Sequence, residues 1–224
     1  MSFSSFFIQS IKRDFQIAAI QKHEFILPVL FFILVIVLFP ITVGPDGTML
    51  SRLASAVGWI ALILSMLIAL PRMFAEDFEN GWLEQVFLSG VPHSLIVLSR
   101  IVSFWLLYCL PLVFCSFLLV PFMSMEVGLW SVLVQTLLLG SILTACLGAV
   151  ASALLVASRK GGGVMALLLI PLLVPSLIFA GAAMDAAQQS LPYTAPITIL
   201  AALAVFSLTI APLATAQALK LNMG

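Results

Sequence analysis

Side chains that commonly do chemistry in proteins are scarce in this sequence, and their spacing matches no catalytic or metal-binding pattern. Cys109, Cys115 and Cys146 lie inside apolar runs, so we expect no disulfide framework, and no CxxC or zinc-ligand spacing occurs. No lysine follows a glycine, so the GxxxxGK[ST] loop that cradles nucleotide phosphates is absent. The apolar runs hold serines and threonines without a basic partner, which disfavours a protease or transferase. We expect no catalytic residue, metal or cofactor on this chain.

Polar residues gather instead in one segment, 72–100, which contains four of the nine carboxylates. Asn80-Gly81 and the Ser-Gly-Val-Pro run at 89–92 are turn signals that bracket a short predicted helix from about 82 to 88. Its apolar side suits a hydrophobic groove on another protein. The alternative is that this side lies back on the membrane, but carboxylates are repelled by an anionic leaflet. The candidate docking residues are Glu76, Asp77, Glu79, Gly81, Trp82, Leu83, Glu84, Gln85, Val86 and Phe87.

The composition indicates whether water or lipid surrounds the rest of the chain. Of 224 residues, 63% are hydrophobic and 8% are charged, whereas a soluble domain has about 25% charged residues. So few charges cannot cover a water-soluble globule, and lipid must solvate most of the surface. Net charge is zero, without the basic cluster that nucleic acid requires, so we expect no nucleic-acid partner.

Charge-free stretches predict the membrane spans, because an ionised side chain is costly in a bilayer core that about 20 helical residues cross. We predict a single all-α permease domain, residues 1–224, with six transmembrane helices. The runs that contain the spans are 25–45, 53–71, 101–125, 127–158, 161–184 and 186–219. The first run could be a signal peptide. It is longer than a 7–15-residue signal core and has no convincing cleavage site, so we predict a retained span.

Basic residues predict that both ends of the chain lie in the cytoplasm. With this orientation only Arg52 is on the outer side, and all other cations are on the inner side. The inner cations are Lys12, Arg13, Lys22, Arg72, Arg100, Arg159, Lys160 and Lys220.

Residues 1–24 predict an amphipathic helix at the membrane surface. Phe3, Phe7, Ile11 and Phe15 recur at helical spacing, opposite Lys12 and its polar neighbours. This helix is either a simple anchor or an elbow that also touches a cytoplasmic subunit.

Small and polar residues inside or beside the spans predict packing and contact sites. Gly140, Thr144, Gly148 and Ser152 form one stripe that permits close helix packing, within the chain or across a dimer. Pro171 and Pro175 predict a kink or a hinge. On the outer side, Asp185 either caps a helix end or contacts a partner, and its polar neighbours Gln188 and Gln189 are further contact candidates.

The sequence resembles the CcmB family of cytochrome c maturation proteins, also called haem exporter protein B. The resemblance rests on LFPITVGPD at 38–46, ALPRMFAEDFENGWLEQ at 69–85 and LLLIPLLVPSLIFAGAAMDAA at 167–187, and it covers essentially the whole chain. The middle motif also resembles the ABC-2 permease pattern, in which an acidic segment and a short helix after span two meet the ATPase.

The resemblance implies a multi-pass permease subunit in the bacterial inner membrane, without catalysis of its own. The implied partners are a CcmA-like ATPase that binds ATP and Mg²⁺, CcmC-like and CcmD-like membrane proteins, and a CcmE-like periplasmic haem chaperone. Two copies of this chain are expected because such ATPases act as pairs. In this family ATP hydrolysis is thought to drive release of the loaded chaperone, and segment 72–100 would be the cytoplasmic coupling segment.

Two other functions stay open. The chain could itself translocate haem or another amphipathic substrate, or it could be a passive scaffold. Haem iron is usually held by His, Met, Cys or Tyr. Here the outer-side candidates are Tyr193, Met123, Met125 and Met184, which are also typical of an interfacial belt. We therefore expect haem in the wider complex and none bound by this chain.

Overall fold

A computed structural model describes residues 3–158 and 161–223, and within these ranges the chain is helical and contains no strand. Six segments of the described chain are long and apolar enough to cross a membrane, which confirms the predicted all-α fold with six spans. They are His23–Val43, Gly47–Glu79, His93–Phe122, Val127–Leu155, Gly163–Gln188 and Thr194–Met223. Arg159 and Lys160, two of the cations used to predict the orientation, lie outside the described residues.

The spans are built from long helices and, in one case, from several short ones. The N-terminal half contains α1 (Phe3–Ile20), α2 (Lys22–Val43), α3 (Gly47–Ala69), α4 (Arg72–Glu79) and α5 (Trp82–Phe87). The third span is α6 (His93–Phe104), η1 (Trp105–Cys109), α7 (Leu110–Cys115), η2 (Ser116–Leu118) and α8 (Leu119–Phe122). The last three spans are α9 (Val127–Leu155), α10 (Gly161–Gln188) and α11 (Thr194–Met223).

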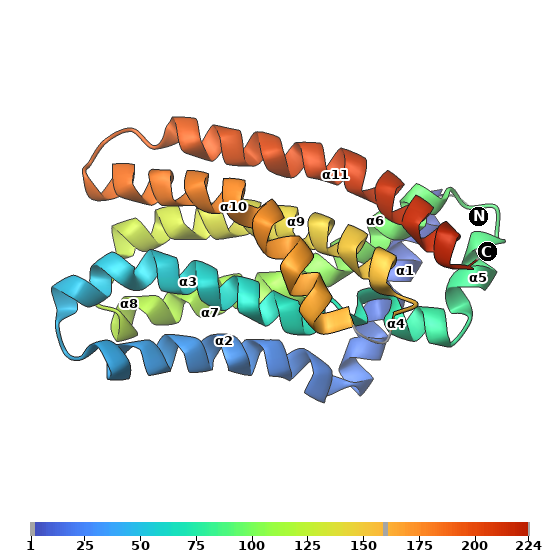
Figure 1. The fold of residues 1–224 in the computed structure, drawn as a ribbon, viewed down its shortest axis with the longest axis horizontal. Helices are drawn as coiled ribbons and strands as arrows, with labels where there is room; N and C mark the ends of the chain where they lie inside the picture. Colours follow the sequence, from blue (N-terminus) through green and yellow to red (C-terminus); the bar gives the residue numbers. More distant parts are fainter. Residues whose placement is uncertain (1–2, 159–160, 224) are drawn as a thin grey trace.

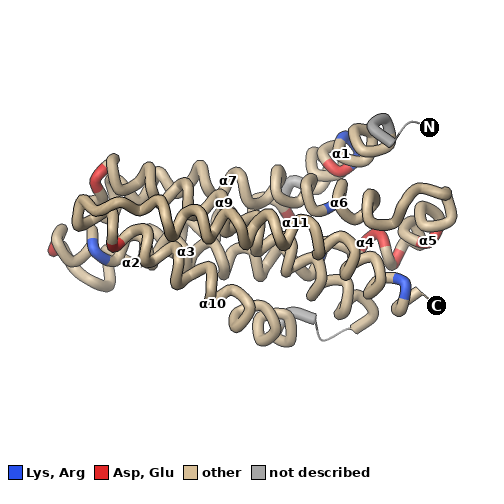
Figure 2. The backbone as a smooth tube through the Cα atoms, turned by 90° about the horizontal axis from the view of Figure 1, so that it is seen from above, with Lys and Arg blue, Asp and Glu red and all other residues tan. Residues whose placement is uncertain are grey.

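The helices form an elongated bundle with two distinct ends (Figure 1). One end carries both chain termini together with α1, α4 and α5, and we call it the terminal end. The other end carries the connections 44–46, 123–126 and 189–193, and we call it the loop end. Charged residues gather towards these two ends and leave the middle of the bundle uncharged (Figure 2). This distribution suits a bilayer between the ends.

The third span is irregular at the residues where proline interrupts its hydrogen bonding. Pro111 lies in the first turn of α7, directly after the π-helical segment η1. Because proline has no N–H and its ring clashes with the preceding turn, the backbone widens there instead of continuing as an α-helix. Further on, the 3₁₀ segment η2 begins at Ser116, whose hydroxyl donates to the Val113 carbonyl at 2.6 Å.

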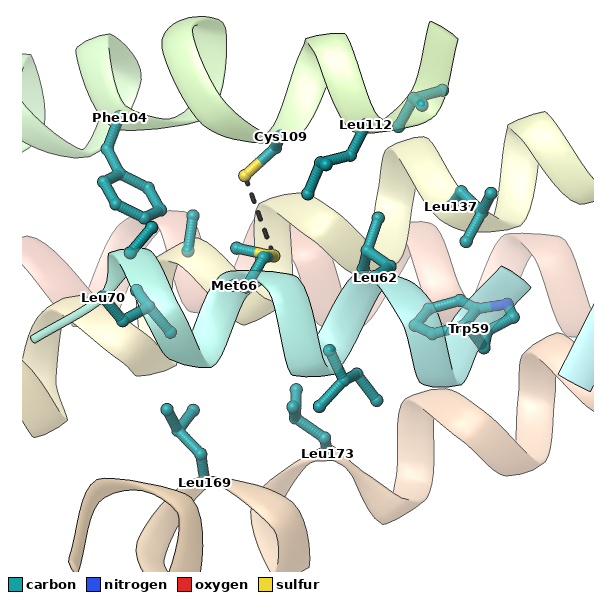
Figure 3. Packing of buried hydrophobic residues seen from close by; sticks show 14 of the residues in the cluster. Trp59, Leu62, Met66, Leu70, Phe104, Cys109, Leu112, Leu137, Leu169 and Leu173 are labelled. Carbon is teal, nitrogen blue, oxygen red and sulfur yellow. Dashed lines mark hydrogen bonds between the residues drawn. The ribbon is translucent and has the colours of Figure 1, made fainter. Parts of the chain in front are cut away.

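The centre of the bundle is α3, which packs against neighbours on several sides. Figure 3 shows Met66 and Leu70 of α3 between Phe104 and Cys109 on one side and Leu169 of α10 on the other. Met66 and Leu70 are fully buried, and the Cys109 thiol lies 3.9 Å from the Met66 sulfur. One polar pair in this core joins α3 to α9, as Thr136 accepts a hydrogen bond from Trp59 Nε1 at 3.3 Å.

The small-residue stripe of α9 is filled by side chains of the same chain. A Cβ atom on Gly140 would lie 1.9 Å from Trp59, and one on Gly148 would lie 2.3 Å from Leu70. Thr144 and Ser152 of the stripe are also buried. Within the chain the stripe is therefore a packing face for α3.

Two helix boundaries differ from those drawn by charge alone. The third span begins at His93, although Arg100 excluded that stretch from the charge-free run 101–125. Arg100 is tolerated inside α6 because carboxylates neutralise it, as described below. At the loop end, α10 continues through Asp185 to Gln188, and α11 begins only at Thr194.

Candidate functional site

The predicted coupling segment folds as two short helices joined by a tight turn. Gly81 takes a left-handed φ of +68°, which reverses the chain between α4 and α5 without the steric penalty that a side chain would bring. The C-terminal end of α5 is closed by Ser89, whose hydroxyl donates to the Val86 carbonyl at 2.6 Å. We call residues 72–88 the α4–α5 hairpin.

A network of four charged side chains fastens this hairpin to the bundle. Arg13 of α1 donates to Asp77 of α4, and Arg100 of α6 lies 3.1 Å from the second oxygen of Asp77. Arg100 also contacts Asp14 of α1 at 2.5 Å and donates from Nε to the Met73 carbonyl at 2.8 Å. Three helices that are distant in sequence therefore meet through two carboxylates and two guanidinium groups.

The network is largely removed from water. Asp14 and Asp77 are 3% and 4% exposed, and the side chains of Arg13 and Arg100 are 28% and 20% exposed. Burial raises the pKa of Asp14 above its ordinary value of 3.8, and the charge of Arg100 acts in the opposite direction. Because each buried carboxylate has a guanidinium partner, removing one member leaves an uncompensated charge, which is strongly destabilising.

Further contacts hold both ends of the hairpin. The Arg13 guanidinium lies over the Trp82 ring, 3.5 Å from its centroid, so the same arginine binds α4 and α5. The Phe87 and His93 rings meet edge to face at 4.5 Å. At the other end of the hairpin, Arg72 and Glu24 form an ion pair of 2.6 Å.

The surface that the hairpin exposes to a partner differs from the surface predicted by helical spacing. Leu83 is 2% exposed and packs in the core, so it does not share the outward face that the helical spacing predicts, and buried Asp77 is likewise withdrawn. Trp82, Val86 and Phe87 are half-buried, and Gly81 forms the turn. Glu76 is exposed and accepts a hydrogen bond from Gln21. The fully outward side chains are Glu79, Glu84, Gln85 and Leu88, of which Leu88 is 87% exposed.

Arg13, Asp14 and Arg100 were missing from the predicted site, although the sequence contains a signal for Asp14. Asp14 lies three residues after Ile11 and seven after Phe7, so it interrupts the apolar stripe of α1. A carboxylate in such a position is buried with the apolar stripe, and it needs a charged or hydrogen-bonding partner because an unpaired buried charge is costly. Nothing in the sequence pattern identifies Arg100 as that partner, because 86 positions separate the two residues.

At the loop end the predicted contact residues are accessible. Asp185, Gln188 and Gln189 are exposed at and just beyond the C-terminal end of α10. A carboxylate is unfavourable at a helix C-terminus, so capping does not explain Asp185. The methionines of the loop end that were considered as haem ligands, Met123, Met125 and Met184, are buried in the core, and Tyr193 is half-buried.

Comparison with known proteins shows the family to which this chain is related. The family model described as CcmB protein matches residues 5–222, which include the whole hairpin and its charged network. The chain belongs to the CcmB family. It is 42% identical to heme exporter protein B of Haemophilus influenzae over 97% of this chain and 98% of that protein. The corresponding Escherichia coli protein is 39% identical, with 97% and 99% covered.

The resemblance seen in the sequence is thereby confirmed. A third relative, heme exporter protein B of Pseudomonas aeruginosa, is 37% identical over 99% of both chains. With six apolar helices and full-length similarity to these bacterial proteins, this CcmB family member is a multi-pass protein of the bacterial inner membrane.

Proposed function

We propose that this chain is the permease subunit of an ABC-type complex for haem export and cytochrome c maturation. Its α4–α5 hairpin receives the movement of a CcmA-like ATPase, and this movement drives release of the haem-loaded CcmE-like chaperone. The names of the relatives support the haem-export role. The observation that carries the coupling role is the charged network that joins the hairpin to α1 and α6. A partner that pushes on the hairpin moves these helices with it.

The terminal end also supports a proposal for how the chain is oriented in the membrane. We propose that the terminal end faces the cytoplasm, which is supported by the excess of lysine and arginine in the segments assigned there. The hairpin would then meet a cytoplasmic ATPase, and α1 would lie at the inner membrane surface with its exposed Ile8 and Phe15 in lipid. Asp185, Gln188 and Gln189 would face the periplasm, where CcmC-like and CcmE-like partners lie.

In this proposal the chain performs no catalytic step and holds no cofactor. ATP and Mg²⁺ bind to the partner ATPase, and haem is held by other subunits, with a CcmD-like protein completing the membrane complex. Two copies of the chain serve the two ATPase subunits. The sequence supports this division of work because it has no phosphate-binding loop.

Recovery of the ATPase in a detergent pull-down tests the docking surface. Leu88→Asp and Glu84→Lys alter side chains that point outward, so folding is expected to persist while ATPase recovery falls at least about tenfold, a loss of about 1.4 kcal/mol. Gln189→Lys makes a matched change on an exposed residue of the loop end and is expected to leave recovery unchanged. Undiminished recovery with both hairpin variants would contradict the proposal.

A second candidate is translocation of haem or another amphipathic substrate by this chain, and the word exporter in the names of the relatives favours it. Reconstituted vesicles that contain the whole complex distinguish the two functions. ATP-dependent haem accumulation in the lumen supports translocation. ATP-dependent release of the haem-loaded chaperone without haem flux supports mechanical coupling, and a passive scaffold would give neither ATP-dependent result.

A further inference from the structure

A cleft of about 400 Å³ lies at the terminal end, beside the charged network and between α1, α2, α4 and the α6–η1 helix. Its volume is within the range of small-ligand sites. The proposed coupling role does not account for it. The residues that line it are Asp14, Ile17, Gln21, Glu24, Phe25, Ala69, Arg72, Met73, Ala75, Glu76, Glu79, Arg100, Ser103, Phe104, Leu107 and Tyr108.

The lining changes from polar to aromatic along the bundle axis. Glu76 and Glu79 of α4 provide the polar part, and Phe25, Phe104 and Tyr108 form a continuous stack with centroid distances of 4.7 Å. Eight residues separate Arg100 from Tyr108, which corresponds to about 12 Å along a helix directed into the bundle. The cleft therefore suits an amphipathic molecule with its polar group at the terminal end.

The charge of the lining selects the sign of that polar group. Asp14, Glu24, Glu76 and Glu79 contribute four carboxylates, against the two guanidinium groups of Arg72 and Arg100. Of these cations, Arg100 also neutralises Asp77, which lies outside the cleft. Carboxylates remain in excess, which favours a cationic group and disfavours a dianionic molecule such as haem.

Two buried polar atoms of the lining, the Asp14 Oδ2 atom and the Ser103 hydroxyl, make no well-formed hydrogen bond to the described residues. Their residues are 3% and 1% exposed, and the Ser103 hydroxyl is close enough to Asp14 to oppose the rise in its pKa. An ionised carboxylate can only accept hydrogen bonds, so Asp14 can accept a further N–H or O–H donor besides this hydroxyl. An ammonium group provides three such donors and the matching charge.

We propose that this cleft binds the headgroup of an ethanolamine phospholipid, with the ammonium among the carboxylates and the acyl chains towards the aromatic wall. Arg72, which has five N–H donors and uses Nη1 for Glu24, is placed to contact the lipid phosphate. The exposed Ile26, Leu27 and Leu30 of α2 continue the apolar surface next to Phe25. The cleft shares Glu76 and Glu79 with the docking candidates, but lipid binding and ATPase recovery are measured separately, so either proposal can fail without the other.

Native mass spectrometry of the full chain in detergent tests the proposal, with palmitoyl-oleoyl phosphatidylethanolamine as the probe. Phosphatidylcholine is the matched lipid, because it keeps the charge but replaces every N–H donor with a methyl group. We expect about tenfold tighter binding of the ethanolamine lipid. Exposed Glu79→Gln and buried Ser103→Ala are expected to reduce this preference, whereas Glu126→Gln, an identical charge change at the loop end, is expected to preserve it.

Three results would contradict the binding of an ethanolamine lipid in this cleft. Equal affinities for the two lipids would mean that the N–H donors of the ammonium contribute nothing to binding and would overturn the proposal. Stronger binding of phosphatidylglycerol, which is anionic and has no ammonium, would overturn the charge argument. Unchanged preference in Glu79→Gln and Ser103→Ala would place the lipid elsewhere on the chain.

Discussion

The guanidinium of Arg13 lies 3.5 Å from the centre of the Trp82 ring while the same group donates to Asp77. One side chain of α1 thus holds both helices of the hairpin. We expect Arg13→Ala and Trp82→Leu each to lower stability, and a double-mutant cycle to give a coupling energy of about 0.5–2 kcal/mol. The measurement is unfolding in mixed micelles of increasing SDS content. Strictly additive losses would mean that the ring and the cation do not interact.

Asp77→Asn is expected to loosen the hairpin. The change leaves Arg13 and Arg100 without their shared carboxylate, and breaking such a buried pair costs about 3–5 kcal/mol. Limited proteolysis with a glutamyl endopeptidase reports on the loosening through cleavage at Glu79 and Glu84. Glu76→Gln changes an exposed carboxylate of the same helix and is expected to cost at most about 1 kcal/mol. Equal cleavage of the two variants would remove the fastening role of Asp77.

Gly140→Ala is expected to destabilise the bundle by about 1–3 kcal/mol, because the added methyl group overlaps the Trp59 ring. The matched control is Gly181→Ala in α10, where a Cβ meets no atom within 4 Å. That substitution is expected to be neutral or to stabilise the helix by up to about 1 kcal/mol. Thermal unfolding in detergent measures both. A Gly140→Ala variant as stable as the parent would show that Trp59 can move away at no cost.

We expect the stability that Asp46 contributes at the loop end to depend on pH. Its side chain caps α3, and hydrogen bonds from the Thr48 hydroxyl and from the Met49 and Thr48 amides lower its pKa below the ordinary value of 3.8. A lowered folded-state pKa contributes stability that is present above the unfolded value and is lost as pH falls through the folded value. Asp46→Ala is therefore expected to lower the melting temperature at about pH 7, with a shrinking difference below about pH 4.

Asp185→Ala is the control for the loss of the Asp46 cap. Asp185 is an exposed carboxylate at the same end of the bundle, but it lies at a helix C-terminus and caps no N–H group. Its removal is expected to leave the melting temperature at about pH 7 unchanged or slightly raised, because a carboxylate is unfavourable at a helix C-terminus. A pH-independent loss in Asp46→Ala would mean that the carboxylate acts through something other than its charge.

The sequence alone was sufficient for the six spans, the position of the polar segment and the turn at Asn80-Gly81. These features depend on local properties of the chain. A bilayer excludes charge from about 20 consecutive residues wherever they lie, and glycine permits a left-handed turn regardless of distant contacts. The stripe of small residues in α9 was likewise visible as a close-packing surface.

Only the tertiary structure decided what covers each of these surfaces. Helical spacing placed Leu83 on an apolar face, but the same face can meet lipid, a partner or the chain itself, and here Leu83 packs in the core. Trp59 and Leu70 fill the α9 stripe for the same reason. The pairing of Asp14 with Arg100 depends on three helices converging at one end of the bundle. Periodicity describes the polarity of a surface, whereas its partner is set by packing between residues far apart in the chain.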